Sequence, residues 1–131
     1  MRWVQNALPY LAVAAGAMVG ANLRYALSTW MVARFGAGFP YGTFFINVSG
    51  AFVIGVFLAL LTERVTLHPL WRPFFATGLL GGYTTFSSYT WEALALARGG
   101  DWLSAVAYVG GSNALGLAGV WLGAMLVSLL R

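Results

Sequence analysis

The chain is 131 residues long, 60% of its residues are hydrophobic, only 8% are charged, and its formal net charge is +4. A soluble domain carries about 25% charged residues, and a chain this short has too much surface for so few charges to cover in water. The expected solvent is therefore a lipid bilayer. The length allows a single domain over residues 1–131, without a separate soluble module.

The basic residues and the rare residue types give further exclusions. All 7 basic residues are Arg, and they are scattered along the sequence instead of forming a patch, so no nucleic-acid partner is expected. The chain has no Cys, which excludes disulfides and thiol chemistry, and its single His68 cannot build a metal site by itself. No catalytic constellation is present, so an enzyme is not expected.

Four apolar stretches are long enough to cross a bilayer, which takes about 20 mostly apolar residues per helix. The first contains Arg24, the third carries Glu92 near its end, and the other two are uncharged. Short connections with Gly and Pro separate them, so consecutive helices are expected to be antiparallel neighbours. The predicted spans are residues 8–33, 41–62, 70–97 and 102–130.

The Arg residues specify the orientation of these spans only weakly. With an even number of spans, both termini lie on one side of the membrane, and the other side holds Arg34 and Arg98, with Arg24 inside the first span near that end. Positive-inside logic needs a clear excess on one face. The small difference is compatible with cytoplasmic termini and equally with insertion in both orientations, which gives antiparallel dimers. The side of the termini has Arg2, Arg64, Arg72 and Arg131.

Polar side chains interrupt the first two spans. Arg24 lies in the last third of the first span, where its guanidinium either snorkels to the interface or marks an ion path. Thr43 and Asn47 lie four residues apart in the second span and share one helical face. The Asn47 amide can donate two hydrogen bonds. Hydrogen bonding between packed helices is the alternative role for this face.

The third span contains an unusual string, Gly81-Gly82-Tyr83-Thr84-Thr85, within residues 78–89. Adjacent Gly and β-branched Thr are poor helix formers, so the sequence predicts a break at mid-membrane. Backbone freed at that depth must be buried in protein, and freed carbonyls in such breaks commonly coordinate Na⁺ or other cations. The alternative is an intact helix in which Gly serves packing and Thr bonds back to its own helix.

The fourth span carries Tyr108 and Ser112 on one helical face, with Asn113 beside them. This stripe of donors suits an anion path, and it suits a packed helix interface nearly as well. A carrier of cations or protons is expected to have an intramembrane Asp or Glu. Here only Glu92 is a candidate, near a span end. The excess of donors over acidic groups therefore indicates an anion.

Three blocks of sequence resemble the Fluc (CrcB) family of fluoride channels. The first runs from residues 16–21 to Arg24-Tyr25, and the second is Gly42-Thr43 with Asn47. The third and most specific is residues 81–87, which read Gly-Gly-Tyr-Thr-Thr-Phe-Ser. The blocks occur in the right spans and order, and the resemblance covers nearly the whole chain.

The resemblance implies an all-α membrane protein of the bacterial inner membrane with four transmembrane helices per subunit, the third of them broken. It implies an antiparallel, dual-topology homodimer with two pores, through which fluoride leaves the cell passively. One structural Na⁺, which is not transported, would lie at the dimer centre, held by backbone carbonyls of Gly81 and Thr84 from both subunits. Such an ion raises the local potential for anions.

Fluoride is expected to pass along polar side chains and the positive edges of aromatic rings. The positions that match the family are Asn47, Phe86, Tyr89, Tyr108 and Ser112. Tyr89 departs from the family pattern, which usually has Phe at both aromatic positions, so the resemblance alone does not extend a ring-edge contact to it. Gly116 is a second departure, because some relatives continue the hydroxyl stripe there. The predicted fluoride pathway also includes Thr43, Thr85 and Arg24.

Two other functions fit parts of the pattern. A small multidrug transporter also has four spans and dual topology, but it needs an acidic residue in its first span, and this chain has none there. A non-conducting accessory subunit of a larger membrane complex is the other alternative. Normal fluoride tolerance in a deletion strain would favour that alternative.

Overall fold

A computed structural model describes residues 2–63 and 65–130, with side chains from residue 7 onward. The side chains of Arg2, Arg64 and Arg131, which enter the charge count above, lie outside the described set. Every regular element among the described residues is a helix. Its elements are α1 (Arg2–Phe35), α2 (Tyr41–Glu63), η1 (Pro73–Leu80), α3 (Gly81–Tyr83), α4 (Phe86–Arg98) and α5 (Trp102–Leu129).

Among the described residues, three helices are long and apolar enough to cross a membrane, over Ala7–Phe35, Tyr41–Glu63 and Trp102–Leu129. They confirm the first, second and fourth predicted stretches as helices. The third predicted stretch, residues 70–97, is not one helix, because it divides into the π-helical η1, the short α3 and the separate α4. Large apolar side chains stay exposed on the long helices, as helices that face lipid require.

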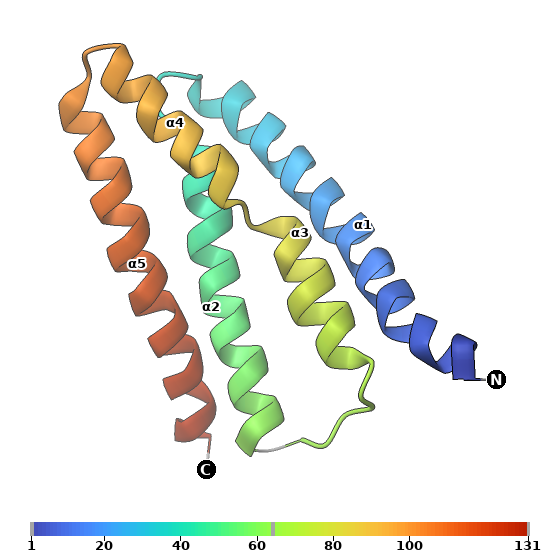
Figure 1. Cartoon of the computed structure of the whole chain (residues 1–131). Coiled ribbons are helices and arrows are strands. Elements are labelled where there is room, and N and C mark those ends of the chain that lie inside the picture. The colour runs from blue at the N-terminus through green and yellow to red at the C-terminus, as the bar shows by residue number, and fades with distance from the viewer. Residues whose placement is uncertain (1, 64, 131) are drawn as a thin grey trace.

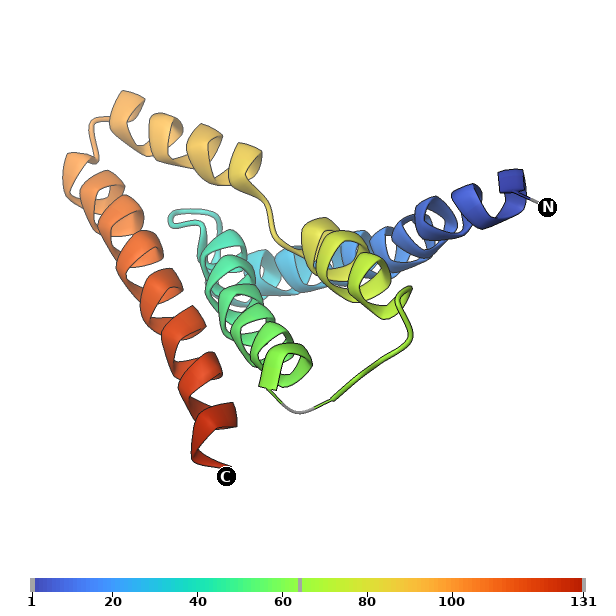
Figure 2. The same cartoon turned by 60° about the horizontal axis from the view of Figure 1, so that its bottom comes forward.

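The helices form two packed groups, which contact each other mainly through α1 and α2 (Figure 1). Helices α2 and α5 lie side by side, and α1 packs along η1 and α3. Figure 2 shows the same pairs from a second direction, with α4 crossing from α3 to the start of α5. Helix α1 begins and α5 ends at the end opposite the two turns α1–α2 and α4–α5.

Glycines permit the close crossing of α1 with η1 and α3. A Cβ added at Gly16 or Gly20 would run into backbone atoms of η1, and a Cβ added at Gly82 would lie 2.8 Å from the Ala17 carbonyl oxygen. Small residues spaced by four let membrane helices approach in this way. Gly16, Gly20 and Gly82 therefore serve packing here. The largest fully buried side chains, Tyr108, Ile46 and Val127, lie instead on α2 and α5.

The two turns at the other end have clear local causes. Gly36 and Gly100 adopt φ of +80° and +84°, a left-handed conformation that favours glycine. Asp101 precedes α5 and its carboxylate accepts a hydrogen bond from the Ser104 N–H at 3.0 Å. Hydrogen bonding from the Ser104 side chain, together with this backbone bond, lowers the pKa of the Asp101 carboxyl, which lies outside the spans.

Candidate ion pathway

The helix that begins in η1 is interrupted at two threonines. Thr84 (φ −81°, ψ 161°) and Thr85 have extended backbone, and α4 begins at Phe86. The interruption falls inside residues 78–89, but the glycines remain helical, with Gly81 at φ −64° and ψ −35°. β-Branched side chains favour extended backbone. Thr85 also caps α4, because its side chain accepts a bond from the Ser88 N–H.

Two polar side chains from other helices bind the backbone at the interruption. The Asn47 amide of α2 donates to the Thr85 carbonyl at 3.0 Å and accepts from the Thr85 N–H at 2.8 Å. The Arg24 guanidinium of α1 donates to the Gly82 carbonyl at 3.0 Å. These bonds replace helical ones that the break removes, so α1 and α2 hold the irregular backbone in place.

Other carbonyls at the break stay without a donor. Within the described residues, no hydrogen bond reaches the carbonyl oxygens of Gly81, Tyr83 or Thr84. The Leu80 carbonyl, in contrast, accepts from both the N–H and the hydroxyl of Thr84, each at 2.9 Å. Unpaired backbone oxygens at membrane depth are costly unless an ion or another chain reaches them.

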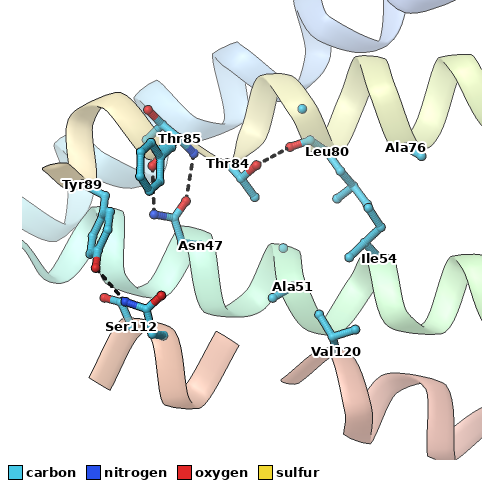
Figure 3. A pocket seen from close by; sticks show the side chains of 14 residues that line it. Asn47, Ala51, Ile54, Ala76, Leu80, Thr84, Thr85, Tyr89, Ser112 and Val120 are labelled. Carbon is cyan, nitrogen blue, oxygen red and sulfur yellow. Dashed lines mark hydrogen bonds between the residues drawn. The ribbon is translucent and has the colours of Figure 1, made fainter. Parts of the chain in front are cut away.

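A cleft of about 400 Å³ opens beside the break, between α2, α4 and α5 (Figure 3). Its apolar end is lined by Ala51, Ile54, Leu80 and Val120, and its polar end by side chains that can donate hydrogen bonds. Five of the predicted pathway residues meet here: Asn47, Thr85, Phe86, Tyr89 and Ser112.

The aromatic and hydroxyl groups of this cleft have defined surroundings. The Tyr89 ring lies 5.7 Å from the Phe86 ring and 5.3 Å from the Tyr108 ring, measured between centroids. The Tyr89 hydroxyl accepts a hydrogen bond from the Asn113 amide at 2.8 Å. The Ser112 hydroxyl is buried and has no partner among the described residues. The donors of the cleft are thus partly unused.

The sequence matches a known protein family over most of its length. The family model described as CrcB-like protein, Camphor Resistance (CrcB), matches residues 11–124. The chain belongs to the CrcB family. A protein of Roseiflexus sp. (strain RS-1) named fluoride-specific ion channel FluC is 53% identical over 87% of this chain and 92% of its own length. Proteins of the same name from Solibacter usitatus and Aquifex aeolicus are 50% and 45% identical, over 91% and 88% of this chain and 98% and 93% of their own lengths.

Membership of the CrcB family agrees with the membrane character of the helices. With three helices that can cross a bilayer and relatives that are bacterial ion channels, the chain is a multi-pass protein of the bacterial cell membrane. The family resemblance drawn from the residues in the three spans is thereby confirmed.

Three predicted pathway residues of this CrcB chain lie away from the cleft lining. Thr43 and Tyr108 both donate to the carboxylate of Glu92, at 2.8 and 2.7 Å. Arg24 binds the Gly82 carbonyl on the α1 side. The hydroxyls of Thr43 and Tyr108 are therefore already used by an acceptor, and both side chains are buried.

Glu92 is the polar residue that the sequence reasoning undervalued. It was noted only as an acidic residue near a span end, yet it joins α2, α4 and α5 through its two oxygens. It also lines a second cleft, of about 450 Å³, near the α1–α2 and α4–α5 turns. One signal was available: Glu92 follows Tyr89 by three residues, which places both on one face of α4.

Proposed function

We propose that this CrcB-family chain is a fluoride-selective channel through which fluoride leaves the cell passively. The observation that carries the proposal is the cleft beside the break, because its described lining offers amide and hydroxyl donors and no carboxylate. The names of the relatives, fluoride-specific ion channel FluC, support the same anion. No chemical step is needed, so the protein acts as a conductor and not as an enzyme.

The donors of the cleft suit a small, strongly hydrated anion. A pore for fluoride must replace the water molecules that donate to the ion. Asn47 uses one amide N–H on Thr85, which leaves its second N–H for an anion, and Ser112 has a free O–H. Phe86 is 76% exposed on α4, so its positive ring edge is accessible to an anion. Several weak donors along a path let the ion both enter and leave.

The proposal includes a broken third span. Read in sequence, η1, α3 and α4 are one crossing interrupted at Thr84 and Thr85, which brings the number of spans to four. The bonds from Arg24 and Asn47 support this interpretation, because they satisfy backbone that the bilayer cannot. Figure 1 shows the α4–α5 turn at the same end of the molecule as the α1–α2 turn, as four crossings require.

The proposal also includes an antiparallel homodimer with a structural Na⁺ at its centre. The carbonyls of Gly81 and Thr84 fit this ion, because oxygens without hydrogen-bond donors are suitable ligands for a hard cation. Gly81 is exposed on the surface of the single chain, where an inverted second copy can reach it. When bound, the cation supplies a fixed positive charge that attracts anions. The nearly balanced Arg distribution supports insertion in both orientations.

Fluoride efflux from liposomes tests the channel. Vesicles loaded with potassium fluoride and reconstituted with purified protein are expected to release fluoride when valinomycin is added, because valinomycin lets K⁺ leave and prevents a membrane potential from stopping the anion. Vesicles loaded with potassium chloride are expected to retain their chloride. A fluoride electrode and a chloride electrode measure both. Absence of fluoride release, or equal chloride release, refutes the proposal.

Cysteine labelling tests the dual topology separately. The chain has no Cys, so Ala37→Cys places a single thiol in the α1–α2 turn. In sealed vesicles from cells, a membrane-impermeant maleimide is expected to label about half of these thiols, since each turn lies on either side of the membrane. Complete labelling or complete protection shows a single orientation and refutes the antiparallel arrangement.

A further inference from the structure

The hydroxyl of Tyr89 has an uncommon hydrogen-bond environment. Tyr89 is 9% exposed on α4, and its oxygen accepts from the Asn113 side chain of α5 at 2.8 Å. The second amide bond of Asn113 goes to the Val109 carbonyl, also at 2.8 Å. Asn113 therefore has no amide donor to spare, and its orientation is fixed by its own helix.

A phenol that accepts a hydrogen bond still has its own O–H to donate. Within the part of the chain that the structure describes, the Tyr89 hydrogen has no acceptor, since the only bond to its hydroxyl is the one from Asn113. The Asn113 bond occupies the α5 side of the oxygen. The remaining hydrogen is therefore free to turn toward the cleft that Tyr89 lines.

Ser112 presents a second free hydroxyl to the same cleft. Its Oγ is buried and makes no hydrogen bond with any described residue, which includes Tyr89. A buried hydroxyl without a partner costs free energy, so such a group usually serves a ligand or a water molecule. Figure 3 shows the Tyr89 hydroxyl directed at α5 beside Ser112. Two hydroxyl donors without acceptors among the described residues, one on α4 and one on α5, suit an anion.

We propose that Asn113 is a positioning residue that holds the Tyr89 hydroxyl, so that Tyr89 and Ser112 form a two-hydroxyl subsite for the permeating anion. The inference rests on the proposed channel function and adds a residue pair to it. A Phe at the Tyr89 position would offer only a ring edge, which is a weaker donor than O–H. In this chain the hydroxyl makes the position a direct hydrogen-bond donor, and Asn113 keeps it from rotating away.

Concentration-dependent fluoride current through reconstituted channels tests the subsite. Hydrogen bonds to a charged group are worth about 1.5–3 kcal/mol, which corresponds to a factor of roughly ten or more in affinity. Tyr89→Phe keeps the ring against Phe86 and Tyr108 and removes only the hydroxyl. It is expected to raise the half-saturating fluoride concentration about tenfold. Ser112→Ala is expected to shift it in the same direction.

The positioning role of Asn113 requires a double-mutant cycle. Asn113→Ala is expected to raise the half-saturating concentration when Tyr89 is present and to change nothing further in Tyr89→Phe. If Asn113 had only a structural role, Asn113→Ala would change the half-saturating concentration equally with Tyr89 and with Phe at position 89, because the bond to the Val109 carbonyl is lost in both cases. Asn22→Ala is the matched control, since the side-chain bond that Asn22 makes among the described residues is intrahelical, to the Met18 carbonyl.

Each outcome has a distinct meaning. An unchanged half-saturating concentration in Tyr89→Phe, with normal current in the wild type, overturns the subsite while the channel function stands. Equal effects of Asn113→Ala in both backgrounds overturn the positioning role. A wild-type protein that conducts no fluoride refutes the proposed function, and the subsite falls with it.

Discussion

Replacing Asn47 with Ala removes the side chain that joins α2 to the interrupted helix. Asn47 makes two hydrogen bonds to one residue, at 3.0 Å to the Thr85 carbonyl and at 2.8 Å from the Thr85 N–H. The Thr85 side chain cannot replace it, because its hydroxyl is engaged with Ser87 and Ser88. Both backbone groups of Thr85 are therefore left without a protein partner in Asn47→Ala.

The expected loss of stability follows from those two bonds. A typical hydrogen bond contributes about 0.5–1.5 kcal/mol net, and leaving a buried partner unsatisfied costs about 1–3 kcal/mol. Water in the adjacent cleft can solvate part of the freed backbone, which favours the lower end of this range. We expect Asn47→Ala to destabilise the protein by about 2 kcal/mol, or roughly 5–10 °C in melting temperature.

Thermal unfolding of the purified protein in detergent measures the change, and hydrogen–deuterium exchange at the Thr85 amide locates it. Asn22→Ala is the control, because its lost bond to the Met18 carbonyl is intrahelical and exposed. We expect the control to stay within about 0.5 kcal/mol of the wild type. The bidentate bond does not stabilise the break if Asn47→Ala has the same melting temperature as the control and its Thr85 amide is as protected from exchange as in the wild type.

The remaining predictions concern conduction, packing and one exposed cap. Phe86→Ile is expected to reduce fluoride efflux sharply while size-exclusion chromatography shows an unchanged assembly; normal efflux would remove the ring-edge argument. Gly50→Val is expected to cost about 1–3 kcal/mol in melting experiments, because even a Cβ at Gly50 meets the Thr84 methyl, whereas Gly110→Val has nothing within 4 Å and serves as control. Asp101 has a lowered pKa, so its cap is present above the ordinary value of 3.8 and is lost as pH falls through the lower folded value. The protection factor of the Ser104 amide, its exchange relative to the intrinsic rate at the same pH, is therefore expected to fall as pH drops below 3.8, and Asp101→Asn, an equally good cap, is expected to abolish that pH dependence.

Composition and spacing predicted the long helices well because those signals are local. The stretches 41–62 and 102–130 agree with α2 (Tyr41–Glu63) and α5 (Trp102–Leu129) almost to the residue. Pro40 and Asp101 mark where these two helices begin, and both signals lie in the sequence itself. The first helix extends beyond its predicted start, to Arg2, because the apolar count alone does not register a polar first turn.

Between α3 and α4 the extended residues are Thr84 and Thr85, while Gly81 and Gly82 stay helical. The sequence predicted a break from the Gly and Thr residues together, yet Gly82 stays helical, and a Cβ at its position would approach the Ala17 backbone of α1. The low helix propensity of Gly82 is offset by its close packing against α1. Helix propensity describes a residue within its own helix and does not include such a contact. The threonines after it unwind instead, where Asn47 of another helix accepts and donates the bonds that are needed.

Long-range pairing explains what the sequence could not predict about the site. Thr43 and Glu92 are 49 positions apart, and Tyr108 reaches the same carboxylate from a third helix. Helical periodicity shows which residues share a face, but it does not show which face of another helix that face meets. The sequence therefore identified Thr43 and Tyr108 as donors without identifying the acceptor that uses them.

The backbone carbonyls at the break fall into two sets, one that is hydrogen-bonded within the chain and one that is available to the proposed partner and cation. The Gly82 and Thr85 carbonyls are satisfied within the chain, by Arg24 and by Asn47. The Gly81 and Thr84 carbonyls, one residue earlier in each case, accept no hydrogen bond from the described residues. One set of oxygens therefore fixes the irregular backbone before any partner or ion arrives, and the other set stays available. On the proposed assembly, a cation at these available oxygens stabilises the association of two already ordered chains, since the order of the break itself comes from α1 and α2.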